Sequence, residues 1–116
     1  VSIHSDSGEG IQRLNQEAAK ALFAGTRAGL SLTREDALRW VTLNPAWQLG
    51  IDREVGSLEV GKRADLVVWD KDPLSVYAKP DLVWVGGELV VDRKAGKDPE
   101  VDFTVGLPKT AEATTP

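Results

Sequence analysis

The chain of 116 residues contains no cysteine and no methionine, and its only histidine is His4. Without cysteine it can form neither a disulfide nor a thiolate metal site. A net charge of −4 and the lack of any basic cluster argue against a nucleic-acid partner. No apolar run is long enough to cross a bilayer, so we also expect no membrane partner.

The lack of methionine bears on where the natural chain starts. Because no initiator is present, we expect that Val1 is not the natural N-terminus and that any targeting region lies outside this sequence. The composition is typical of a soluble globular protein, and among compartments the cytoplasm is slightly favoured.

The first third of the chain predicts a strand followed by a helix. Residues 1–6 alternate apolar and polar side chains, which is typical of the end of a strand. Apolar residues then recur at helical spacing, and we predict a helix over residues 10–28 that is closed by Gly29. The apolar face of this helix includes Leu14, Ala18 and Leu22, and it needs a partner surface.

Two shorter helices are predicted next. Thr33 and Asp36 have the spacing of a capping box, with Asp in place of the usual Glu, and open a second helix. Asn44 as cap and Pro45 as first helical residue open a third helix, which Gly50 ends. Four tryptophans lie in or beside apolar helix and strand patterns, and we predict core packing for all of them: Trp40, Trp47, Trp69 and Trp84.

After Gly50 the pattern changes to that of strands. Residues 55–62 predict a short strand and a turn, and residues 64–69 predict an apolar, β-branched strand. Residues 82–85 and 88–91 predict two more strands, separated only by Gly86-Gly87. Two glycines can take the positive φ values of a tight turn, so these two strands are predicted to form a hairpin.

Residues 4–7, HSDS, hold the residues that most suggest chemistry. In a strand, His4 and Asp6 would lie on the same face, where an imidazole beside a carboxylate resembles half of a metal site or an acid–base pair. Each residue also has a structural alternative. Asp6 could be the N-cap of the following helix or a turn residue, and His4 could be packed or face solvent.

Several longer motifs resemble one enzyme family. The segments HSDS, RLNQEAAKAL, LTREDALRWVTLNPAWQLGI, VGSLEVGKRADLVVWDKDPLSVY and VWVGGELVVDR are together similar to the C-terminal third of an amidohydrolase-superfamily enzyme. The resemblance is to the branch related to imidazolonepropionase, and it covers nearly all of residues 1–93. The GSLEVGKRADLVVWDKDP segment is its most specific part.

The resemblance implies an α/β fold in three parts. Residues 1–50 would form the end of a TIM-like metal-dependent hydrolase barrel, namely its last strand and the following helices. Residues 51–93 would supply strands of a small composite β-sandwich. Residues 94–116 match nothing in the family, and their polar composition predicts a partly disordered tail.

The resemblance also implies a site. Asp6 falls at the metal-binding aspartate of the last barrel strand, which in such enzymes also takes a proton from the attacking water. The implied cofactor is a divalent metal, zinc by preference, with His4 as a weaker second ligand candidate. A catalytic zinc takes about three protein ligands, so we expect the chain alone to bind no metal and to be inactive.

Two functions follow from these observations. The first is a segment of a metal-dependent hydrolase, whose parent hydrolyses a C–N bond in a small-molecule substrate with an amide, cyclic amide or peptide-like group. The second is a truncated, non-catalytic module that self-associates through its strands. Because strands and helices are expected to lack their barrel neighbours, we predict a homo-oligomer.

Overall fold

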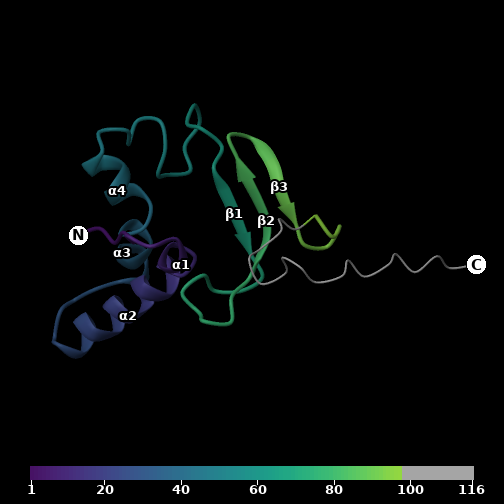
Figure 1. The fold of residues 1–116 in the computed structure, drawn as a ribbon. Helices are drawn as coiled ribbons and strands as arrows, with labels where there is room; N and C mark the ends of the chain where they lie inside the picture. The colour runs from purple at the N-terminus through teal and green to yellow at the C-terminus, as the bar shows by residue number, and fades with distance from the viewer. Residues whose placement is uncertain (98–116) are drawn as a thin grey trace, which may run out of the picture.

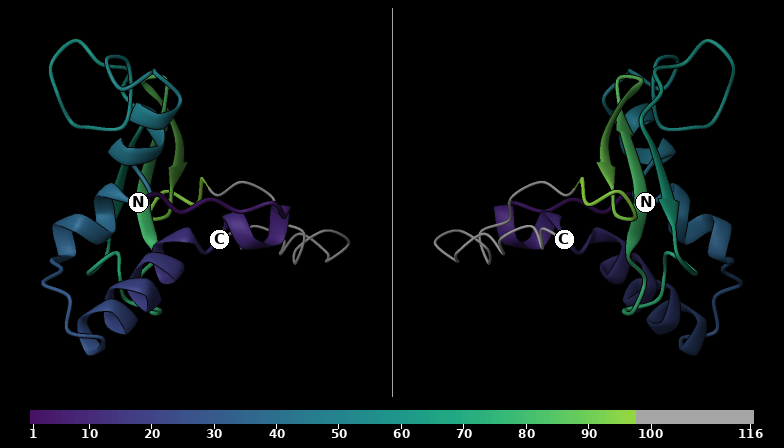
Figure 2. Two further views of the ribbon diagram at one scale, coloured as in Figure 1. Left: turned by 90° about the vertical axis from the view of Figure 1, so that its left-hand side faces the viewer. Right: turned by 90° about the vertical axis from the view of Figure 1, so that its right-hand side faces the viewer.

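The computed structural model describes residues 1–97, which form a group of helices beside a three-stranded sheet (Figure 1). The fold is α/β. The helices and strands, in chain order, are α1 (Gly8–Ile11), α2 (Leu14–Arg27), α3 (Arg34–Arg39), α4 (Leu43–Gln48), β1 (Leu66–Trp69), β2 (Pro80–Val85) and β3 (Glu88–Asp92). Side views show α1 projecting away from α3 and α4 at the end of an extended N-terminal segment (Figure 2).

The helix predicted over residues 10–28 is present as two helices, α1 and α2. The N–H of Arg13 donates to the carbonyl of Gly10, and this tighter turn separates the two. The end of α2 is as predicted, because the N–H of Gly29 donates to Thr26 O and the N–H of Leu30 donates to Gly25 O. These two bonds form a Schellman motif.

The helices bury a small core that also receives a side chain from the sheet region. Ala18 of α2 packs with Ala37 and Trp40 of the α3 region, and Leu22 packs against this cluster. Much of the predicted apolar face of α2 is therefore covered within the chain, while Leu14 is half-buried outside the cluster. Leu74, from the loop after β1, completes this cluster. In the same loop Asp72 pairs with Arg34 of α3, and this hydrogen bond lowers the pKa of the Asp72 carboxyl. Helices and sheet are therefore joined through this loop.

The start of α3 is as predicted, whereas the start of α4 is not. Thr33 and Asp36 form a reciprocal capping box, and the N–H of Thr33 donating to Asp36 holds the pKa of that carboxyl below its usual range. α4 begins one residue before Asn44, with Thr42 at the N-cap position and no side-chain cap. The side chain of Asn44 is therefore free to bond elsewhere.

Core packing is confirmed for one of the four tryptophans and is wrong for another. Trp40 is 7% exposed and belongs to the helical core. Trp47 is 70% exposed, because α4 turns the neighbouring Ala46 inward and successive helical residues point about 100° apart. Trp69 and Trp84 in the sheet are half-buried.

The sheet has the order β1-β2-β3 and is antiparallel throughout. Val85 pairs with Glu88 across Gly86-Gly87, and both glycines have positive φ, of 60° and 87°. The predicted tight hairpin is confirmed, since only a turn with left-handed residues matches the twist of the two strands at this length.

Two predicted strands are absent from residues 1–97. Residues 1–6 and 55–59 form no strand, because no neighbouring strand offers them a ladder of hydrogen bonds. The turn predicted in the second segment is present, since the N–H of Lys62 donates to Glu59 O. The second segment folds around Lys62, whose side chain is 11% exposed. Its ammonium group donates to Asp52 O and Ser57 Oγ, both at 2.5 Å.

The two edges of the sheet differ. Lys97 pairs with Asp92 through two backbone hydrogen bonds of 2.8 and 2.9 Å, and its ammonium group also donates to the carbonyl of Leu89. Lys97 therefore occupies part of the outer edge of β3, at Asp92 and Leu89, whereas no strand of residues 1–97 pairs with the outer edge of β1. Most of the predicted tail, residues 98–116, lies outside the described residues. Among the described helices, none has both the length and the hydropathy needed to span a membrane.

Candidate functional site

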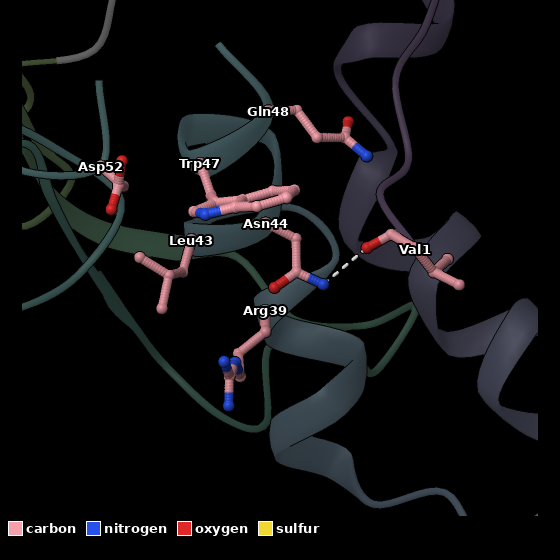
Figure 3. A pocket seen from close by; sticks show the side chains of 7 residues that line it. All are labelled: Val1, Arg39, Leu43, Asn44, Trp47, Gln48 and Asp52. Atoms are coloured by element: carbon pink, nitrogen blue, oxygen red, sulfur yellow. Dashed lines mark hydrogen bonds between the residues drawn. The ribbon is translucent and has the colours of Figure 1, made fainter. Parts of the chain in front are cut away.

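The N-terminal segment that leads to HSDS is held by α3 and α4. The N–H of Ile3 donates to the carbonyl of Trp40 at 2.8 Å, and Asn44 Nδ2 donates to the carbonyl of Val1 at 2.6 Å (Figure 3). The hydroxyl of Ser2 donates to Gln48 Oε1. The side chain of Ile3 packs against the helical core. Residues 1–3 are thus fixed to the helices by residues about 40 positions further along the chain.

The segment then bends at Asp6 and Ser7, and serine side chains shape the bend. Ser5 Oγ donates to Ser7 O at 2.9 Å and accepts from the N–H of Ser7 at 3.2 Å. Ser7 is the N-cap of α1, since its Oγ accepts from the N–H of Gly10 at 2.9 Å. Ser7 therefore takes the capping role that was the structural alternative for Asp6.

His4 and Asp6 lie side by side, as predicted, although residues 1–6 are not a strand. His4 Nδ1 is 3.3 Å from Asp6 Oδ1, and the side chains are 80% and 96% exposed. Among the described residues, the Asp6 carboxylate has no hydrogen-bond or ion-pair partner other than His4. Both groups are thus open to a ligand or to further protein.

The described residues do not complete a metal site around this pair. No cluster of three or more potential His, Cys, Asp or Glu ligands occurs within residues 1–97. A catalytic zinc takes about three protein ligands, and His4 and Asp6 supply only two. The donor set present here is therefore insufficient by itself for the implied metal.

A pocket of about 380 Å³ lies beside the anchored segment, on the outer side of α4 (Figure 3). Its lining residues are Val1, Arg39, Leu43, Asn44, Trp47, Gln48 and Asp52. A neighbouring pocket of about 530 Å³ shares Leu43 and Asp52 with it. Neither pocket is lined by His4 or Asp6.

The sequence patterns missed the role of Asn44 and Gln48. Asn44 was predicted as a helix cap and Gln48 was given no role, but both reach across to the N-terminal segment. The available signal was their spacing, because residues four apart on a helix share a face.

Comparison with known proteins places the chain in a family. Residues 4–91 match the family described as "Amidohydrolase family". The chain belongs to the amidohydrolase family. This family generally depends on metal ions, in agreement with the metal that the resemblance implied.

Two relatives show how much of a family member this amidohydrolase chain represents. "Amidohydrolase tasK" of Hapsidospora irregularis is 41% identical over 81 residues, which are 70% of this chain and 8% of the relative. The crystal structure of an amidohydrolase from Thermotoga maritima MSB8 matches with a TM-score of 0.61 and 35% identity, over 72% of this chain and 20% of that one. The amidohydrolase chain thus spans a small part of the length of either relative.

Proposed function

We propose that this chain is the C-terminal part of a metal-dependent amidohydrolase and that Asp6 is its catalytic contribution. The observation that supports this most is that the Asp6 side chain is exposed and does not cap a helix. Its carboxylate is 96% exposed, and Ser7 rather than Asp6 caps the following helix. A carboxylate without a structural task, next to the lone imidazole, is available for chemistry.

In this proposal the parent enzyme hydrolyses a C–N bond in an amide, cyclic amide or peptide-like substrate, as an imidazolonepropionase-related enzyme would. Asp6 accepts a proton from the water that attacks the carbonyl carbon, and a carboxylate suits this role as a general base. A divalent metal, zinc by preference, would be held by Asp6 together with ligands from polypeptide outside this chain. His4 is the weaker candidate ligand.

The test is to replace Asp6 with Asn in the complete enzyme. Asn keeps the shape of the side chain but cannot take up the proton, so turnover should fall by a factor of about 10² to 10⁴. Glu88→Gln removes a charge from the exposed hairpin and serves as the control. Near-normal turnover of the Asp6→Asn enzyme would remove Asp6 from the mechanism.

The same proposal makes the 116-residue chain inactive on its own. The purified chain should show no hydrolysis of amide or lactam substrates with added zinc, because the described donors are too few to hold it. Chelator-sensitive turnover by the purified chain would contradict this expectation.

A second candidate function is a non-catalytic module that self-associates, and the sheet edges favour it. β1 is uncharged, from Leu66 to Trp69, and its outer edge has no partner strand among residues 1–97. Val67 and Val68 are each 46% exposed on this strand. Such an edge invites pairing with a second copy, and the homo-oligomer expected from the sequence would then form through β1.

A further inference from the structure

Each of the first three residues of the chain forms a hydrogen bond either to α4 or to Trp40 at the end of α3. Val1 receives a hydrogen bond from Asn44 at 2.6 Å, Ser2 donates to Gln48, and Ile3 donates to the carbonyl of Trp40 at 2.8 Å. Figure 3 shows the Asn44 amide directed at the carbonyl of Val1. No residue of this short segment is left without an anchor.

The anchors themselves are well fixed. Asn44 and Gln48 are four residues apart on α4, so both side chains leave the helix on the same face. α4 is held by the burial of Ala46, and Trp40, at the end of α3, belongs to the helical core. The position of residues 1–3 is therefore set by their hydrogen bonds to the packed helices.

His4 and Asp6 have no such support of their own. Their side chains are largely exposed and touch mainly each other. Their place in space must come from the residues before them and from the serine-shaped bend after them. From these contacts, and resting on the proposed function of Asp6, we infer that Asn44 is a positioning residue that holds the backbone leading to Asp6.

Asn44 positions the segment through its side-chain Nδ2 group, which donates the hydrogen bond to Val1. Aspartate has the same shape but only acceptor oxygens at neutral pH, so Asn44→Asp would place a carboxylate against the carbonyl of Val1. The chain offers a matched control in Asn15. Its Nδ2 donates to the carbonyl of Pro73 at 2.7 Å, which is the same kind of long-range bond but is made to a residue outside residues 1–6.

The first measurement uses the 116-residue chain and does not depend on activity. Amide hydrogen exchange at Ile3, followed by NMR, should become roughly 3- to 10-fold faster in Asn44→Asp, since one net hydrogen bond is lost. Ser2→Ala, which removes the hydroxyl donor without altering α4, should act in the same direction. Asn15→Asp should leave exchange at Ile3 unchanged. Equal acceleration in Asn15→Asp and Asn44→Asp would reveal general destabilisation and overturn the inference.

The second measurement uses the complete enzyme. Asn44→Asp should lower kcat by about tenfold to a hundredfold with a smaller change in KM. A displacement of the Asp6 carboxylate by about 1 Å slows the reaction more than it weakens substrate binding. Asn15→Asp should keep the wild-type kcat. If Asp6→Asn abolishes turnover but Asn44→Asp does not reduce it, the positioning role is wrong while the proposed function stands. If Asp6→Asn remains active, both are wrong.

Discussion

Replacing Gly56 with Ala should destabilise the chain far more than replacing Gly61 with Ala. The two glycines have nearly the same backbone conformation, with φ of 91° and 93°. A side chain is strained at either position, at a cost of about 1–2 kcal/mol. What separates the two sites is the space around them.

At Gly56 an added Cβ would lie 2.7 Å from the Cβ of Ala46, 3.1 Å from the Cα of Leu43 and 3.1 Å from the carbonyl oxygen of Thr42. Two of these atoms are backbone, and Ala46 is buried in α4, so none can move without moving the helix. At Gly61 an added Cβ would meet nothing within 4 Å. Overpacking typically costs about 1–3 kcal/mol, which adds to the strain at Gly56 only.

We therefore expect Gly56→Ala to lower the free energy of unfolding by about 2–5 kcal/mol in total, against about 1–2 kcal/mol for Gly61→Ala. Urea denaturation followed by tryptophan fluorescence measures both values under one condition. Equal losses for the two variants would show that the loop carrying Gly56 does not pack against α4 as described, and the reasoning would fail.

Three further outcomes are expected. Trp40→Ala should cost about 3–5 kcal/mol of unfolding free energy, whereas Trp47→Ala should change it by less than about 0.5 kcal/mol; similar losses in urea denaturation would contradict the two burial values. The pKa of the Asp36 carboxyl is lowered in the folded chain, so the charged carboxylate stabilises the fold above the unfolded value near 4, and this effect is lost as the pH falls through the folded value. Asp36→Asn should therefore destabilise the chain at pH 6 and much less at pH 2. The same loss of unfolding free energy at both pH values would exclude the charged cap. If β1 mediates self-association, Val67→Lys should shift light scattering at micromolar concentration towards the monomer, and an unchanged mass would exclude that edge.

Features that depend on neighbouring residues could be predicted from the sequence. The capping box of Thr33 and Asp36, the end of α2 at Gly29 and the Gly86-Gly87 hairpin were all recognisable, because each is set by residues within a few positions. The strand over residues 1–6 and the short strand predicted before the turn of residues 55–62 were wrong for the opposite reason. A strand forms only with a partner, and alternation in one segment does not reveal whether a partner is present.

The candidate site divides in the same way. The proximity of His4 and Asp6 could be predicted because they are two residues apart in the sequence, although a bend rather than a strand brings them together. The bond from Asn44 to Val1 spans 43 positions and could not be read from local spacing. Local spacing also could not predict that Trp47 is exposed, because this depends on α4 burying Ala46 rather than the larger Trp47 beside it.

The unequal edges of the sheet decide how far any association could grow. A sheet with two open edges can add copies at both sides and extend into a fibre, as stacked strands do. Here Lys97 occupies one side, with its backbone on Asp92 and its ammonium group on Leu89. Two copies that meet through β1 would each present outward a β3 edge that Lys97 occupies in part, which disfavours growth through these edges beyond a two-fold symmetric pair.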